Sequence, residues 1–121
     1  MFHMPRNLEW KLTKVIEKYS LGSFKLGWFI GDFEPSIYKN EAFEIGLKYF
    51  KSGQVEPSHM QNTATEITVV INGIVQFLDE KYFPGDIIKI PPKFLANFVC
   101  IEDAVLICIK YPSIPNDKIV P

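Results

Sequence analysis

The chain has 121 residues, of which 47% are hydrophobic and 14% aromatic, so it can form a folded core and is too apolar to be disordered. Its formal net charge is -1 and neither sign forms a block, which excludes the clustered basic surface of a nucleic-acid-binding protein. It shows no secretory signal and no apolar run near the ~20 residues of a membrane helix, so we expect a soluble, cytoplasmic protein with no membrane partner.

Short runs of β-branched and aromatic residues, separated by nine prolines and seven glycines, predict an all-β sandwich or barrel. Residues 8–19 fit either a strand or a short helical turn. A strand is expected over residues 24–33, where Gly27 and Gly31 indicate a bulge or a close backbone approach. Alternation over residues 42–50 predicts another strand, with four apolar residues on one face and two charged residues on the other: Phe43, Ile45, Leu47 and Tyr49, and Glu44 and Lys48.

Asn72-Gly73 joins two β-branched runs and predicts a hairpin, because both central positions of a type I′ turn need positive φ. Polar residues 79–81 and the Pro84-Gly85-Asp86 segment predict two more turns. Pro91-Pro92 ends the strand before it, since proline cannot donate to a ladder. Glu102-Asp103 is expected to separate the last two strands. The strands predicted after the hairpin are residues 86–90, 94–101 and 104–111.

A spaced pattern runs from Gly53 through His59, Gln61 and Glu66 to Gly73, and Gly85 is followed after five residues by Pro91. This pattern resembles the two motifs of the cupin family. The family has histidine where this chain has Gln61, and it has glycine and histidine in the second motif where Lys93 and Ala96 stand. The resemblance implies a double-stranded β-helix, or jelly-roll barrel, forming one cupin domain over residues 1–121, with core motifs at 53–73 and 85–96 and a C-terminal tail at 112–121.

Two further segments are similar to a group of small cupins. One is Gly-Trp-Phe-Ile-Gly-Asp-Phe at residues 27–33, and the other is the Pro-Ser-x-Pro-x-Asp-Lys tail at residues 112–118. This likeness adds to the fold prediction and implies little chemistry. Asp117-Lys118 is expected to be a solvated pair, with docking over the barrel mouth as the alternative.

The resemblance implies that His59, Gln61 and Glu66 converge inside the barrel, because residues two apart on an extended segment share a face. They are the metal ligands if a metal is bound. Gln61 and Ala96 replace stronger donors, so we expect no cofactor, or at most a weakly held divalent metal. Without a metal, His59 and Glu66 are candidate catalytic acid–base groups, and with Gln61 they are candidate ligand-binding residues.

The sequence therefore predicts a barrel with a degenerate metal site that binds, or acts on, a sugar, a sugar nucleotide or a small organic acid. One alternative is a metal-dependent enzyme, a dioxygenase or an isomerase. Another is a structural or regulatory dimer without a ligand. A homodimer is expected because unpaired edge strands invite pairing between copies. Cys100 and Cys108 lie in apolar strand-like runs and are expected to be buried, reduced thiols.

Overall fold

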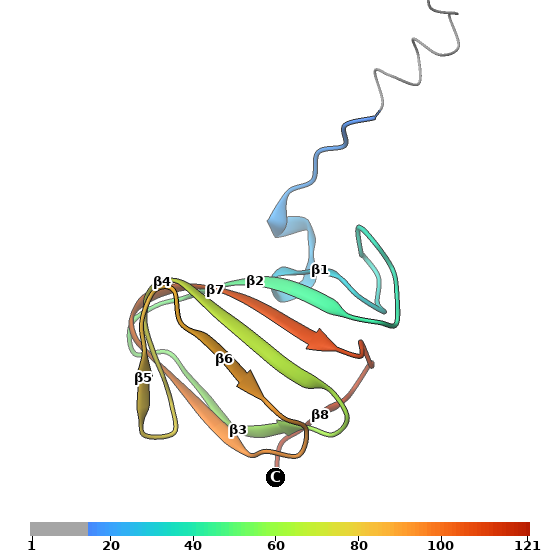
Figure 1. Cartoon of the computed structure of the whole chain (residues 1–121). Helices are drawn as coiled ribbons and strands as arrows, with labels where there is room; N and C mark the ends of the chain where they lie inside the picture. The colour runs from blue at the N-terminus through green and yellow to red at the C-terminus, as the bar shows by residue number, and fades with distance from the viewer. Residues whose placement is uncertain (1–14) are drawn as a thin grey trace, which may run out of the picture.

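The computed structural model describes residues 15–121, which contain two short 3₁₀ turns, Leu21–Ser23 and Lys25–Gly27, followed by eight β-strands (Figure 1). The all-β prediction is confirmed. Residues 8–14 of the ambiguous first segment lie outside the described residues, and residues 15–19 form neither helix nor strand. Within the described part, no helix is both long and apolar enough to cross a membrane. The strands are β1 (Trp28–Ile30), β2 (Glu44–Phe50), β3 (Val55–Gln61), β4 (Thr65–Phe77), β5 (Glu80–Tyr82), β6 (Ile87–Ile90), β7 (Ala96–Tyr111) and β8 (Lys118–Ile119).

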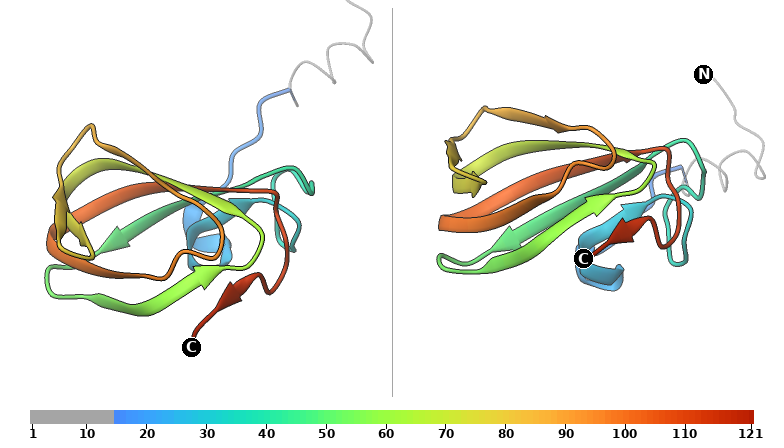
Figure 2. Two further views of the ribbon diagram at one scale, coloured as in Figure 1. Left: turned by 60° about the horizontal axis from the view of Figure 1, so that its bottom comes forward. Right: turned by 90° about the horizontal axis from the view of Figure 1, so that it is seen from below.

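Two long strands, β4 and β7, organise the barrel. They pair with each other along most of their length, and all pairings between named strands are antiparallel. Their first and second halves belong to different layers. One layer contains β1, β2, the second half of β7, the first half of β4, and β6; the other contains β8, β3, the first half of β7, the second half of β4, and β5. Figure 2 shows the sheet curling back on itself in this way.

The hairpin predicted at Asn72-Gly73 is wrong. The strand β4 continues through these residues, and β7 likewise continues through Glu102-Asp103, so the two paired strands bend together. Register shifts between Val70 and Val75 mark the bend. Gly73 has φ +83°, and a side chain there would collide with the backbone carbonyl of Asp103. Glycine is therefore required at a corner where two backbones touch, rather than at a turn.

The first predicted strand is much shorter than expected. Only Trp28–Ile30 pairs as a strand, because Leu26 and Gly27 before it have positive φ and belong to a 3₁₀ turn. The predicted bulge is present as a register shift between Trp28 and Ile30. The predicted close approach is present too, since a side chain on Gly27 would collide with the Leu47 carbonyl oxygen.

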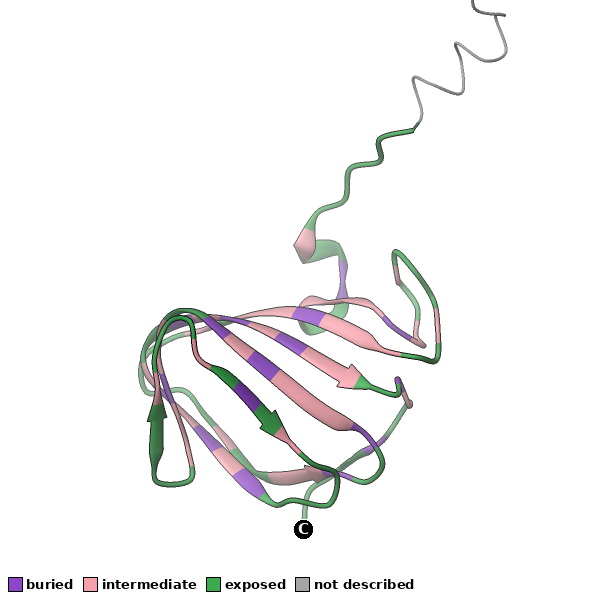
Figure 3. Ribbon diagram, in the orientation of Figure 1, coloured by how far each residue is buried: buried purple, intermediate pink, exposed green. Residues whose placement is uncertain are grey.

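The apolar core fills the interior near the corner of β4 and β7, where buried residues recur along both strands (Figure 3). Phe98 packs against Phe50 and Phe77, with ring centroids 4.6 and 5.3 Å away. Both cysteines are buried free thiols, as predicted. The core cluster comprises Val70, Val75, Ile88, Phe98, Cys100, Ala104, Leu106 and Cys108.

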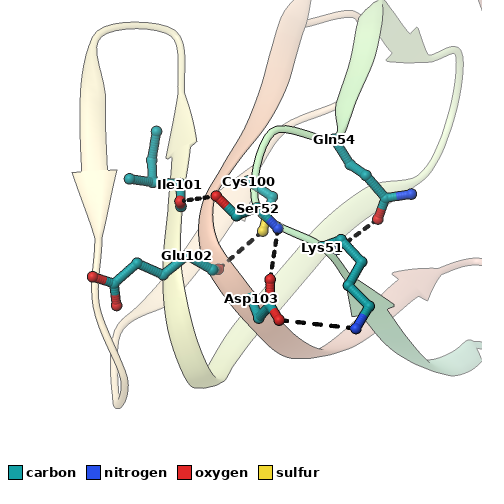
Figure 4. Close-up of polar contacts among 7 residues, drawn as sticks. All are labelled: Lys51, Ser52, Gln54, Cys100, Ile101, Glu102 and Asp103. Carbon is teal, nitrogen blue, oxygen red and sulfur yellow. Dashed lines mark hydrogen bonds and ion pairs between the residues drawn. The ribbon is translucent and has the colours of Figure 1, made fainter.

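Polar contacts close the barrel at this corner (Figure 4). The backbone N–H of Ser52 donates to the Asp103 carboxylate over 2.8 Å, and the Ser52 hydroxyl donates to the Ile101 carbonyl over 2.7 Å. Lys51 forms an exposed ion pair with Asp103 at 3.9 Å. These contacts fasten the turn between β2 and β3 to the bend of β7. Polar side chains that face inward gather at the opposite end of the barrel.

Candidate ligand site

A cavity of about 220 Å³ lies inside the barrel at the end away from this corner. The structure brings the three predicted site residues, His59, Gln61 and Glu66, together in its wall. Its other polar side chains come from five different strands, and half of its apolar lining residues are aromatic. The polar groups are Lys48, Glu56, Thr68, Cys108, Lys110 and Lys118, and the aromatic ones are Trp28, Phe50, Phe77, Phe94 and Phe98.

Strand pairing explains how His59, Gln61 and Glu66 converge. His59 lies opposite Ala96 on β7, and Gln61 lies opposite Lys118 on β8. Glu66, near the start of β4, lies opposite Lys110 on β7. Glu56 and His59 are three positions apart on β3, so a regular strand would place their side chains on opposite faces. A register shift between them lets both residues reach the cavity.

Gln61 is the most unusual group in the wall. It is only 5% exposed, and neither its amide oxygen nor its amide nitrogen has a hydrogen-bond partner. Its backbone is fixed, because its carbonyl accepts a 2.7 Å hydrogen bond from Lys93 N–H. Leaving a buried amide unpaired costs roughly 1–3 kcal/mol. A polar group inside the cavity would remove this cost.

His59 is oriented by its own strand. Its Nδ1 lies 3.0 Å from the carbonyl oxygen of Pro57. A carbonyl can only accept, so Nδ1 carries a proton. In the neutral imidazole, Nε2 is then free to accept a proton or a hydrogen bond.

The sequence reasoning did not identify two lysines as site residues. Lys48 on β2 and Lys110 on β7 both line the cavity, and their Nζ atoms lie 4.8 and 4.7 Å from the centroid of the Trp28 ring. Lys48 Nζ also donates a 2.6 Å hydrogen bond to the Leu26 carbonyl. Burial lowers the pKa of the Lys48 ammonium, and the positive charges of Lys110 and Lys118 act in the same direction. The alternation of charged residues along residues 42–50 was the available signal, but it did not show which face points inward.

Trp28 reaches the lysines because Gly46 leaves room for it. A Cβ on Gly46 would lie 2.8 Å from the indole ring, closer than side-chain carbons approach. Gly46 is buried and pairs with Trp28 across β1 and β2. The absence of a side chain at residue 46 thus sets the position of the aromatic wall.

Cys108 is expected to be an unreactive thiol. Burial raises the pKa of its thiol to about 12, with the nearby Glu66 adding to the shift, so the group is neutral near pH 7. Thr68 Oγ1 donates to its sulfur over 3.9 Å. A neutral, buried thiol of this kind is a packing group rather than a nucleophile.

The C-terminal tail docks at the open end, so the expectation of a solvated Asp117-Lys118 pair is wrong for Asp117. Asp117 is 8% exposed, and its carboxylate accepts hydrogen bonds from Thr63 N–H at 3.0 Å and Ala64 N–H at 2.9 Å. Its carbonyl accepts a third from Asn62 N–H at 2.9 Å. The tail is thereby fixed to the loop between β3 and β4, and it places the exposed Lys118 at the cavity.

The tail also contacts the early segment that carries Trp28. The buried Ser113 hydroxyl accepts a 2.8 Å hydrogen bond from Asp32 N–H and donates to Glu44 over 3.2 Å. Burial raises the pKa of Glu44, against the effect of Lys110. The two segments noted in the sequence, residues 27–33 and 112–118, are therefore neighbours in space.

The donor set does not fit a tightly bound divalent metal. It offers one imidazole, His59, and two carboxylates, Glu56 and Glu66, and Ala96 stands directly opposite His59. Across residues 15–121, no three His, Cys, Asp or Glu side chains are grouped so as to hold a metal ion. Three lysines in the same wall add positive charge, which opposes a cation.

Comparisons with known proteins agree on the fold. No protein-family model and no curated protein matches the chain. Among solved structures, an uncharacterized conserved protein with a double-stranded β-helix domain from Klebsiella pneumoniae subsp. pneumoniae superposes with a TM-score of 0.62 at 13% identity, over 86% of this chain and 96% of that one. An RmlC-like cupin from Desulfovibrio desulfuricans gives a TM-score of 0.56 at 24% identity, over 64% and 79%. The DMSP lyase DddQ from Ruegeria pomeroyi gives 0.65 at 17% identity, over 77% of this chain and 49% of the lyase.

These likenesses define the architecture as a double-stranded β-helix. More narrowly, the chain has the fold of the small RmlC-like cupins, as its glycine and proline spacing predicted. The chain spans about half the length of the lyase.

Proposed function

We propose that this protein is a small-molecule-binding barrel in which His59, Gln61 and Glu66 orient a polar ligand. The observation that carries the proposal is the Gln61 amide, which is buried, unpaired and part of the cavity wall. Aromatic walls supply contact area and a few polar groups supply orientation, which is the usual division in ligand pockets. Solved structures with this fold include a protein named as a DMSP lyase and one named as a salicylate 1,2-dioxygenase.

The size of the cavity limits which classes of ligand can fit inside it. At about 10–15 Å³ for each water-sized group, 220 Å³ accommodates roughly fifteen to twenty-two such groups. A monosaccharide or a small organic acid fits this space. A sugar nucleotide is considerably larger and would have to extend through the mouth, so we favour the smaller ligands.

The test is a thermal-shift screen of sugars and small organic acids, followed by titration of each compound that raises the melting temperature. A ligand at a hundred times its dissociation constant stabilises the fold by about 2.7 kcal/mol. We expect His59→Ala and Gln61→Leu to weaken binding, and Gln61→Leu to leave the free protein as stable as the wild type or more so, because it removes an unpaired amide.

The matched control is Tyr49→Ala on the outer face, where the side chain is 65% exposed. This variant should bind normally. If no compound shifts the melting temperature and His59→Ala alters only stability, the ligand-binding proposal fails and a structural dimer becomes the better account.

A second candidate function, acid–base catalysis on the bound molecule, is favoured by the orientation of His59. With Nδ1 held by the Pro57 carbonyl, Nε2 of the neutral ring is available as a base. Glu66 lines the same cavity and is the second candidate acid–base group. Proton exchange into a bound ligand, followed by NMR in D₂O, tests this role. Exchange should disappear in His59→Gln, and unchanged exchange in that variant would reject it.

A further inference from the structure

We propose that the ligand is a small carboxylate whose acid group is bound by the ammonium groups of Lys48 and Lys110 beside Trp28. The inference rests on the proposed function and names the class of molecule that the site takes. Both lysines approach one aromatic ring from different strands, and both line the cavity. The ion pairs formed by residues 15–121, Lys39 with Glu34 and Lys51 with Asp103, involve neither of them.

Placing Lys48 and Lys110 beside the same ring destabilises the ligand-free protein. Two like charges beside one ring repel each other, and partial burial removes water that would screen them. The lowered pKa of Lys48 reflects the same environment. Cation–π contact with Trp28 and the bond to the Leu26 carbonyl offset part of this cost. An anion in contact with these ammonium groups would offset more of it.

The charge of the wall favours a single negative charge on the ligand. Three lysines and two glutamates line the cavity, which gives a net charge of +1 when all five are ionised: Lys48, Lys110, Lys118, Glu56 and Glu66. A carboxylate balances this charge. A phosphate monoester carries about -1.5 to -2 at pH 7 and would overcompensate beside two glutamates.

The remaining polar groups indicate what accompanies the carboxylate. Gln61 offers an unpaired amide that both donates and accepts, and His59 offers a ring nitrogen. Such groups match hydroxyl or carbonyl oxygens. The ligand class is therefore a short hydroxy- or ketocarboxylate that fits within 220 Å³.

Calorimetric titration of acids against neutral molecules of the same skeleton tests the inference. The probes are lactate with lactamide, gluconate with sorbitol, and pyruvate with pyruvamide, with inorganic phosphate alongside. We expect at least one acid to bind about tenfold or more tightly than its neutral counterpart and more tightly than phosphate. Binding should weaken as NaCl is raised from 50 to 500 mM.

Lysine variants then locate the anion. Lys48→Met and Lys110→Met should each weaken binding of that acid at least about tenfold. Lys81→Met, at an exposed position on β5, should not change it. Lys48→Arg and Lys110→Arg keep the charge and serve in place of either methionine variant that does not fold, where a changed geometry should weaken binding less than loss of charge.

The outcomes separate the two proposals. A neutral sugar that binds well, with affinity unchanged in the lysine variants, would overturn the carboxylate assignment and leave the binding barrel intact. Tighter binding of phosphate than of every acid would overturn it as well. If neither acids nor sugars bind at millimolar concentration, the proposed function and this inference fail together.

Discussion

Asp117 provides a direct test of whether the tail closes the barrel. Its carboxylate accepts hydrogen bonds from the backbone N–H groups of Thr63 and Ala64. Ala64 is 1% exposed, so water cannot easily replace the lost acceptor. Asp117→Ala removes the acceptor for both donors and weakens the attachment of the tail to the loop between β3 and β4, while the backbone hydrogen bond from Asn62 N–H to the residue-117 carbonyl remains.

The expected loss of folding stability in Asp117→Ala can be estimated from these two donors. A hydrogen bond to a charged group contributes about 1.5–3 kcal/mol, but Thr63 is exposed and its N–H can bond to water instead. We therefore expect Asp117→Ala to lower the free energy of unfolding by about 2–4 kcal/mol. For a chain of this length each kcal/mol shifts the melting temperature by about 4 °C, which gives a decrease of about 8–16 °C.

Urea unfolding and thermal melting followed by circular dichroism measure the change. Asp79→Ala, in an exposed turn, is the matched control and should shift the melting temperature by less than about 2 °C. Asp117→Asn keeps one oxygen acceptor and should lie between the two. Asp117→Ala should also weaken ligand binding, because Lys118 follows it in the wall. A melting temperature for Asp117→Ala within about 2 °C of the wild type would refute the idea that this carboxylate fixes the tail.

Four further measurements probe the site and the assembly. Gly46→Ala should displace the Trp28 ring and weaken ligand binding in a titration, and normal binding would show that the indole position is unimportant. Cys108 should resist iodoacetamide at pH 8 in the folded protein and react after unfolding, because burial raises its pKa to about 12; fast labelling of folded protein would contradict this. Zinc binding measured by calorimetry should be weak in the native chain and stronger in Gln61→His with Ala96→His, whereas tight stoichiometric metal in the native chain would favour the metal-enzyme alternative. The expected homodimer should sediment at twice the mass of one chain, and a monomer at micromolar concentration would reject it.

The fold was predictable from the sequence because its glycines and prolines occupy positions where the local backbone conformation requires them. Pro91 ends β6 as expected, and Gly85 has φ +94° in its turn. The corner at Gly73 was not predictable from local sequence. Asn-Gly is a strong hairpin signal, but here the deciding contact is with the carbonyl of Asp103, thirty positions away. Long-range pairing of β4 with β7 overrides the local preference.

The ligand site was predictable only in part, and β2 shows why. His59 and Glu66 were found through motif spacing, which encodes where β3 and β4 enter the barrel. Lys48 has no such motif. On an alternating strand of a soluble sandwich, the usual rule places the apolar face inward and the charged face in water.

The strand β2 reverses this rule. Its charged face, with Glu44 and Lys48, turns toward the hollow end of the barrel, and its apolar face turns outward, where Tyr49 is 65% exposed. On that outer face Leu47 pairs with Ile107 of β7, which in turn pairs with Val69 of β4, so an apolar stripe crosses three strands. Directing charge into an interior is costly unless something there interacts with it. The reversal of β2 therefore supports a charged ligand inside the barrel, and the same reversal leaves an outer apolar stripe suited to contact with a second copy.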